Sequence, residues 1–153
     1  MRLFRILLLV IAAAYPTLTF AQRERFPQED LEKVEQMFPQ AKRTSTSLRY
    51  VVLTEGQGKK AKPGDLVDVL YTGKLLDGTV FDQWLDPEKP FSFRLGRDNV
   101  IDGWEEGLQL MNPGQKMILI VPYELAYGTR GQPPRIPRRA TLVFEIELVK
   151  VHP

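Results

Sequence analysis

The residues of this sequence that could do chemistry are mainly aromatic. Six of them are expected in or beside segments that converge on one sheet: Tyr71, Phe81, Phe91, Trp104, Tyr127 and Phe144. Core packing explains any single one of them, because aromatic side chains contribute much of a protein's buried surface. As a set they indicate an apolar pocket, whose chemistry would be binding in a water-poor site rather than attack by a nucleophile.

Groups for nucleophilic, metal or phosphate chemistry are scarce. The chain has no cysteine and a single histidine, His152, next to the last residue. A Ser-His-Asp triad or a histidine zinc site would therefore depend on a frayed end. Gly-rich phosphate-binding patterns are also missing. We expect no metal and no cofactor, and the pattern disfavours hydrolases of these kinds, kinases and nicotinamide enzymes.

Short β-like runs separated by Gly, Pro and Asp begin at Leu48. Strands are predicted at residues 49–54, 66–76, 79–83, 91–95, 116–121 and 141–151. Asp77-Gly78 is typical of a hairpin turn between the second and third of these runs. In the last run every second residue from Leu142 to Leu148 is a large apolar one, which makes it the clearest strand.

One helix is predicted in this part of the chain. Asp98 or Asn99 could cap it, and Asn112-Pro113-Gly114 would stop it. Its apolar side would consist of Ile101, Trp104, Leu108 and Met111. Mostly consecutive strands with a single helix favour an α+β fold, in which an antiparallel sheet packs around that helix.

Residues 1–21 have the order of a secretory signal peptide. Arg2 and Arg5 precede an apolar stretch at residues 6–14, and Thr19 and Ala21 are the small residues of a cleavage site after Ala21. An uncleaved membrane anchor is the alternative, although a spanning helix needs about 20 apolar residues and this run has about nine. We expect export, to the periplasm or outside the cell if the source is bacterial, and no membrane span after cleavage.

Residues 22–46 are polar and charged and lie between this leader and the domain expected at residues 47–153. One helix-like stretch runs from Gln28 to Phe38, with Leu31, Val34 and Phe38 at spacings of three and four. This narrow apolar stripe leaves three alternatives open: packing on the domain, pairing with a second copy, or loose order. We expect a monomer.

Seven short motifs follow one another between about Leu48 and Val151. They are Tyr71-Thr72-Gly73, Asp77-Gly78, Phe81-Asp82, Pro90-Phe91, Gly103-Trp104-Glu105-Glu106-Gly107, Ala126-Tyr127-Gly128 and Ala140-Thr141-Leu142-Val143-Phe144. In this order and spacing they closely resemble the FKBP-type peptidyl-prolyl cis-trans isomerase family. The resemblance implies an antiparallel sheet of five to six strands wrapped on one short helix, with a proline pocket between them.

The resemblance also implies which residues form that pocket. The catalytic set would be Tyr71, Asp82, Ile101, Tyr127 and Phe144, and the substrate-binding set Phe81, Phe91, Val100, Trp104 and Ile136. Trp104 would be the floor. The backbone N–H of Ile101 and the hydroxyl of Tyr127 would donate to a ligand carbonyl. Ile101 is expected in the first helical turn, where backbone donors have no intrahelical acceptor.

The implied activity is peptidyl-prolyl cis-trans isomerisation of proline-containing polypeptides. An X–Pro bond rotates over a barrier of about 18–20 kcal/mol that comes from amide resonance. The twisted transition state has lost this resonance and its carbonyl is less dipolar, so an apolar pocket favours it over the planar amide. A non-catalytic proline-binding module or holdase chaperone of the same fold is the alternative, and macrolide drugs are a further ligand class.

Two positions depart from the family pattern. The arginine that commonly follows the pocket aspartate by five residues is replaced by Pro87. Asp82 therefore needs another donor, either Tyr71 or Tyr127, or contact with solvent. The histidine that is frequent in the long loop is replaced by Gln132. These departures bear on catalytic strength and macrolide binding more than on the fold.

Charge gives no reason to expect nucleic acid as a partner. Arg2 and Arg5 account for the net charge of +2, because residues 22–153 carry 19 basic and 19 acidic side chains. The Pro-rich segment 122–140 does contain four arginines: Arg130, Arg135, Arg138 and Arg139. Without a basic surround they predict a solvated rim that could bias the pocket toward acidic clients.

Overall fold

The computed structural model describes residues 23–153, so the predicted leader at residues 1–21 lies outside the described part. The elements follow the order α1 (Gln28–Met37), β1 (Lys42–Arg43), β2 (Arg49–Thr54), β3 (Leu66–Leu75), β4 (Val80–Trp84), β5 (Phe91–Arg94), α2 (Asp102–Leu108), β6 (Lys116–Val121), the 3-10 turn η1 (Tyr123–Leu125) and β7 (Leu142–His152). Among these residues, no helix has the length and apolar character needed to cross a membrane.

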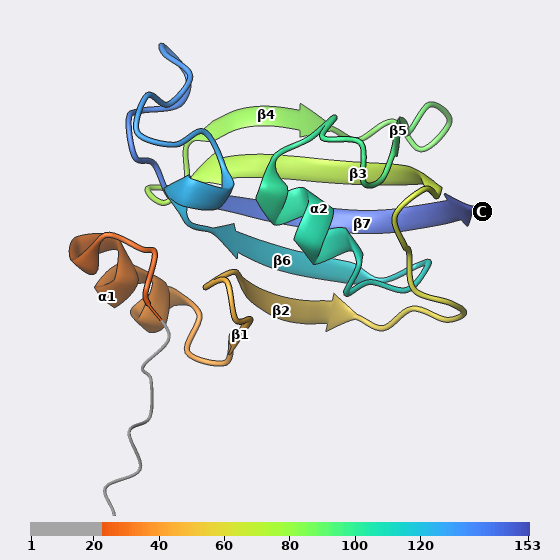
Figure 1. Cartoon of the computed structure of the whole chain (residues 1–153), viewed down its shortest axis with the longest axis horizontal. Coiled ribbons are helices and arrows are strands. Elements are labelled where there is room, and N and C mark those ends of the chain that lie inside the picture. Colours follow the sequence, from red (N-terminus) through yellow and green to blue (C-terminus); the bar gives the residue numbers. More distant parts are fainter. Residues whose placement is uncertain (1–22) are drawn as a thin grey trace, which may run out of the picture.

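The strands form one antiparallel sheet with α2 lying across one of its faces (Figure 1). The strand order is β1-β2-β6-β7-β3-β4, and β5 pairs with the first half of β3 while β4 pairs with the second half. The predicted α+β fold is confirmed. The sheet has seven strands rather than five or six, because residues 42 and 43 of the N-terminal segment add the short strand β1.

Alternation along the strands gives the sheet two apolar faces. In β6, Leu119 and Val121 join the large core cluster, whereas Ile118 and Ile120 belong to a separate cluster. Neighbouring residues of a strand point to opposite sides, so the two clusters lie on opposite faces. We call the side with α2 the inner face and the other side the outer face.

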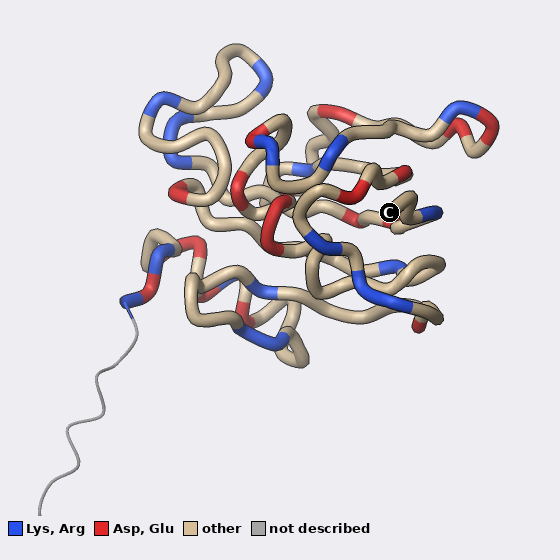
Figure 2. Tube along the Cα trace, turned by 45° about the vertical axis from the view of Figure 1, so that its right-hand side comes forward, with Lys and Arg blue, Asp and Glu red and all other residues tan. Residues whose placement is uncertain are grey.

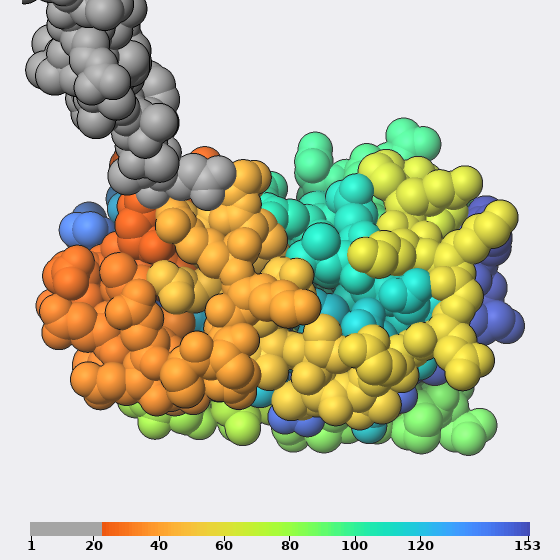
Figure 3. Space-filling view, turned by 90° about the horizontal axis from the view of Figure 1, so that it is seen from below, coloured from red at the N-terminus to blue at the C-terminus, as the bar shows by residue number. Residues whose placement is uncertain are grey.

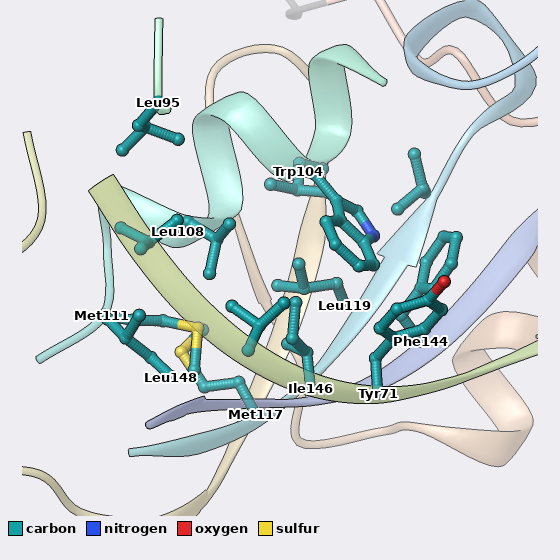
Figure 4. Close-up of a cluster of buried hydrophobic side chains, with 14 of the residues drawn as sticks. Tyr71, Leu95, Trp104, Leu108, Met111, Met117, Leu119, Phe144, Ile146 and Leu148 are labelled. Carbon is teal, nitrogen blue, oxygen red and sulfur yellow. The ribbon is translucent and has the colours of Figure 1, made fainter. Parts of the chain in front are cut away.

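Helix α2 packs closely on the inner face because two of its residues have no side chain. A Cβ atom at Gly103 would collide with Val121, and one at Gly107 would collide with Leu119. Residues four apart lie on the same side of a helix, so both glycines face β6. Trp104 and Leu108, both buried, extend from α2 toward the strands (Figure 4).

The helix begins later than the sequence predicts. Neither Asp98 nor Asn99 caps it; the N-cap is Ile101, which has an extended backbone. The carbonyl of Ile101 accepts hydrogen bonds from the N–H groups of Trp104 and Glu105, at 2.9 and 3.1 Å. The expectation that Ile101 lies in the first turn is therefore wrong by one position. Asp98 has a φ of 54°, a left-handed conformation that an α-helix cannot include.

The helix also ends earlier than expected, at Leu108 rather than near Met111. The N–H groups of Leu110 and Met111 donate to the carbonyls of Gly107 and Leu108, both at 3.1 Å. These bonds span three residues, so the chain tightens into turns instead of continuing as an α-helix. Met111 is fully buried all the same, because these turns carry it into the core.

Helix α1 packs on the outer face. Val34 is fully buried in a cluster with Phe26 and Ile120. The hydroxyl of Thr141 donates to Asp30 at 2.7 Å, which joins α1 to the start of β7. In Figure 3 the N-terminal segment, in orange, covers one side of the molecule beside β2. Of the three alternatives for residues 22–46, the described part shows packing on the domain; the boundary at residue 47 stays a prediction.

Candidate active site

A cavity of about 280 Å³ opens on the inner face, between the sheet, α2 and the loop after β6. Its lining consists of Tyr71, Phe81, Asp82, Phe91, Asn99, Val100, Ile101, Trp104, Tyr127 and Phe144. The structure thus brings nine of the ten predicted site residues around one cavity. It does not bring Ile136 to the lining, and it adds Asn99, which the sequence did not indicate.

Trp104 forms the base of the cavity and makes edge-to-face contacts with three other rings of the lining. Its ring centre lies 4.8 Å from that of Tyr71 and 5.3 Å from that of Phe144, at interplanar angles of 83° and 80°. Phe91 lies 6.3 Å away at 74°. These edge-to-face contacts fix the Trp104 ring. Figure 4 shows Tyr71, Trp104 and Phe144 together at one end of the core, while Met111, Met117 and Leu148 fill the other end.

The side wall of the cavity depends on a residue without a side chain, Gly73 on β3. Gly73 pairs with Asp82 on β4 and with Phe144 on β7. A Cβ atom there would lie 2.7 Å from the Phe81 ring and 2.9 Å from the Phe144 ring. The two rings meet above this glycine at 5.6 Å and 89°. Glycine at position 73 therefore makes the room that the two phenylalanines occupy.

Asp82 is the one carboxylate of the lining. The hydroxyl of Tyr71 donates to its Oδ2 at 2.7 Å, and the N–H of Gln83 donates to its Oδ1 at 2.9 Å. Asp82 is itself an exposed residue. Where the family pattern would place an arginine, at Pro87, this chain thus satisfies the exposed carboxylate with the Tyr71 hydroxyl and the Gln83 N–H.

The pKa values of both tyrosine hydroxyl groups in the cavity, Tyr71 and Tyr127, lie above the ordinary value for tyrosine. Burial raises the pKa of Tyr71, and the hydrogen bond to Asp82 and the charge of that carboxylate raise it further. Burial also raises the pKa of Tyr127, with a second contribution from the charge of Asp82. Both hydroxyl groups therefore keep their protons to a higher pH than an ordinary tyrosine does.

Several donors of the lining have no acceptor among the described residues. They include the backbone N–H of Ile101, just before α2, and the hydroxyl of Tyr127. The indole N–H of Trp104 is also unpaired, and it is buried. A ligand carbonyl in the cavity could accept from these groups. Within residues 23–153 no cluster of three or more His, Asp or Glu side chains could hold a metal.

Ile136 lies behind the cavity rather than in its lining. It is 2% exposed and belongs to the inner-face core cluster. Its N–H and carbonyl pair with the carbonyl and N–H of Gln132, at 3.0 and 2.9 Å. Gln132 and Ile136 thus close the tip of the loop around residues 133–135. Ile136 is placed to anchor the loop that begins with Tyr127.

Asn99 was missed because its own chemistry gave no signal. Its side chain is exposed and donates to the carbonyl of Arg94 at 3.4 Å. Only its position directly before Val100 and Ile101 could have indicated that Asn99 lines the cavity, because residues next to each other in a lining segment often both reach the cavity.

Comparison with known proteins gives the same family for this arrangement. The profile of the family described as FKBP-type peptidyl-prolyl cis-trans isomerase matches residues 57–149. A peptidyl-prolyl cis-trans isomerase FKBP2 from Mus musculus is 53% identical over 92 residues, which are 60% of this chain and 66% of the relative. The FKBP-type 22 kDa peptidyl-prolyl cis-trans isomerase from Escherichia coli is 42% identical over 135 residues, 85% of this chain and 65% of the relative.

A solved structure extends this likeness to three dimensions. The crystal structure of FkpA from Escherichia coli superposes with a TM-score of 0.74 at 43% identity, covering 82% of this chain and 58% of that one. In sequence, the FKBP-type peptidyl-prolyl cis-trans isomerase FkpA is 47% identical over 112 residues, 73% of this chain and 40% of the relative. The matches thus span between 40% and 66% of these relatives' lengths. The chain belongs to the FKBP-type peptidyl-prolyl cis-trans isomerase family.

Proposed function

We propose that the protein catalyses cis-trans isomerisation of X–Pro bonds in polypeptides. The observation that carries this proposal is the aromatic cavity of about 280 Å³ with unpaired donors at Ile101 and Tyr127. Pockets for small molecules commonly have about 300–1,000 Å³. A cavity just below this range suits one prolyl ring better than a larger group.

Catalysis would follow from binding a twisted amide better than a planar one. The rings of Tyr71, Trp104 and Phe144 exclude water from the base of the cavity. In such surroundings the planar amide, which has the more dipolar carbonyl, loses more solvation than the twisted one. The cavity would hold the prolyl ring, and the donors of Ile101 and Tyr127 would hold the carbonyl. The groups on both sides of the X–Pro bond would thus be oriented while the bond rotates.

The energy required is modest. An acceleration of roughly a thousand- to a million-fold corresponds to about 4–8 kcal/mol of transition-state stabilisation. Desolvation in the cavity, two hydrogen bonds and orientation of the prolyl ring can supply this together. Asp82 contributes as a positioning residue, because its bond from Tyr71 fixes a ring that contacts Trp104 and Phe144.

The natural substrates would be exported proteins. Residues 1–21 have the order of a signal peptide, and a prolyl isomerase sent out of the cytoplasm, to the periplasm or the medium, would meet newly translocated chains there. The protein would act as a monomer. Macrolide drugs would compete for the same cavity, with an affinity that depends on how Tyr71 replaces the missing arginine partner of Asp82.

The test is the cis-to-trans rate of a short X–Pro peptide, measured with and without the protein. We expect clear acceleration that saturates with peptide and that a proline-free peptide of the same length does not inhibit. A folded protein that binds the peptide without accelerating it would contradict the isomerase and support the alternative, a proline-binding module or holdase chaperone.

A further inference from the structure

The cavity continues into a second hollow along strand β4. This hollow, of about 640 Å³, shares Phe81 and Asp82 with the cavity. One side consists of the β3–β4 hairpin and strand β4, and the other consists of Pro134, Arg135 and Pro137 from the long loop. We call it the β4 groove. A polypeptide with its proline in the cavity has a continuous path into this groove past Phe81.

The side of the β4 groove that is formed by strand β4 suits an extended chain. Strand β4 is the last strand of the sheet, and no other strand of residues 23–153 pairs with its free side. An unpaired strand edge offers backbone donors and acceptors to an extended peptide. Val80, which is 48% exposed, adds an apolar surface in the middle of the groove. The two prolines opposite keep that wall stiff.

The groove has one uncommitted charge, Arg135. In the described part of the chain Arg135 is exposed and has no hydrogen bond or ion pair. Two neighbouring arginines are engaged: Arg138 donates to the carbonyl of Thr129 at 3.2 Å, and Arg139 lies over the ring of Tyr123. Figure 2 shows the basic residues of this loop, in blue, where it projects from the sheet.

Acidic side chains are the complement of Arg135, which has no partner among residues 23–153. The other charged residue of the groove is Asp82, whose carboxylate already accepts from Tyr71 and Gln83. An extended chain advances about 3.3 Å per residue. A chain that follows β4 from Asp82 toward Thr79 therefore reaches Arg135 roughly two to four residues from the proline.

We propose that the β4 groove is a specificity subsite, which rests on the proposed isomerase function. It binds client residues roughly two to four positions from the proline in extended form, and Arg135 selects an acidic side chain among them. Arg135 thereby changes which X–Pro bonds are isomerised fastest, while the isomerisation itself takes place in the cavity.

The test uses a series of X–Pro peptides in which Glu, Gln or Lys occupies each of the four positions on either side of the X–Pro pair. We expect Glu to raise kcat/KM about two- to five-fold over Gln at one or two positions on a single side, as for an exposed ion pair at low salt. In Arg135→Gln this preference disappears, so that the ratio of kcat/KM between Glu and Gln peptides at these positions falls to about one. Added salt should reduce the preference in the unaltered protein.

Arg130→Gln is the matched control, because Arg130 is exposed on the same loop but does not line the groove. It should keep the Glu preference. Equal rates for Glu and Gln at every position would overturn the proposal, and so would an equal loss of preference in both variants, which would indicate the general charge of the rim.

Peptide affinity separates failure of the subsite from failure of the isomerase. If the protein accelerates no peptide, the dissociation constants of the same Glu and Gln peptides are compared. Tighter binding of Glu that depends on Arg135 would support the groove even though the proposed activity had failed. Equal affinities would overturn the groove.

Discussion

The inner and outer faces of the sheet are built from alternate residues of the same strands, yet they are completed differently. On the outer face, Ile120 packs with Val34 of α1, and both are fully buried. On the inner face, α2 covers the core around Leu119. Next to Trp104, however, the aromatic side chains do not fill the space between them, and the cavity of about 280 Å³ remains.

This difference indicates which apolar cluster is open to the proposed substrate. The chain's own helix buries Val34 and Ile120 in the outer cluster, although a hollow of about 250 Å³ remains beside Phe38, Ile118 and Val143. The inner cluster borders the cavity at one end, where the lining also includes the ring of Tyr127 at 36% exposure. Both clusters contribute to stability, but only the inner one surrounds the cavity that holds the predicted site residues, so variants of the two faces should differ in their effect on activity.

The largest effect is expected from Trp104→Ala on the inner face. Removing a buried aromatic side chain costs about 3–5 kcal/mol of folding free energy. The same change removes the base of the cavity, and we expect kcat/KM per folded molecule to fall roughly ten- to a hundred-fold, about 1.4 kcal/mol for each factor of ten. Denaturant unfolding and peptide isomerisation rates check both numbers. Normal turnover by a folded variant would contradict the role of the cavity.

Ile120→Ala on the outer face should lower stability by a comparable amount without the loss of activity. Ile120 is fully buried beneath α1, so truncation should cost about 2–5 kcal/mol. At a temperature where the variant is folded, kcat/KM should equal that of the unaltered protein. A clear loss of turnover in this variant would mean that the outer face also shapes the cavity.

A smaller effect is expected from Tyr71→Phe, which keeps the ring and removes its hydroxyl. The bond to Asp82 is lost, but Asp82 is exposed and can bind water instead. We expect a stability loss of about 0.5–1.5 kcal/mol and a loss in kcat/KM of only a few-fold. Tyr71→Leu, which removes the ring as well, is the comparison. Equal turnover in the two variants would show that the ring itself contributes nothing.

The dependence of folding stability on pH should have opposite signs for a group on the outer face, Glu24, and one on the inner face, Tyr71. Burial of Glu24 opposes its ionisation, but the N–H groups of Arg25 and Phe26 and the charges of Arg43 and Arg49 outweigh burial and lower the pKa of Glu24 below its ordinary 4.5. The resulting stabilisation is full above pH 4.5 and is lost as pH falls through the lowered value. Glu24→Gln should flatten the acid side of the stability profile.

On the inner face the corresponding loss comes at alkaline pH. The pKa of Tyr71 is raised above its ordinary 10.0, first by burial and then by Asp82. Its stabilisation is full below pH 10 and is lost as pH rises toward the raised value. Unfolding free energies across pH should show this in the unaltered protein and less of it in Tyr71→Phe. Phenolate absorbance that develops for Tyr71 in the ordinary tyrosine range would contradict it.

Much of the sheet could be predicted because its residues alternate over long runs. The pattern from Leu142 to Leu148 places these side chains on the inner face, and the structure agrees. The helix boundaries were less predictable. Asp98 is a good capping residue by type, but its left-handed backbone in the loop excludes it, and only the tertiary path of that loop decides this.

The candidate site could be predicted where motifs carry large side chains and not where geometry alone decides. Trp104 and Phe144 were identified through their motifs, whereas Ile136 was placed in the lining although the loop turns it into the core. The docking of α1 was open for a similar reason. Val34 and its neighbours form a narrow stripe, and the partners that bury it, Ile118 and Ile120, belong to a strand whose outer side the sequence did not mark.

The most direct test of the division between the faces compares two adjacent residues of β7. Phe144 lines the cavity, and Val143 packs in the outer cluster. X–Pro isomerisation rates per folded molecule are measured for Phe144→Ala and Val143→Ala, with folding confirmed for each. We predict that turnover falls at least about ten-fold in Phe144→Ala, a loss of about 1.4 kcal/mol or more, and stays unchanged in Val143→Ala. Equal turnover in the two variants would contradict the account.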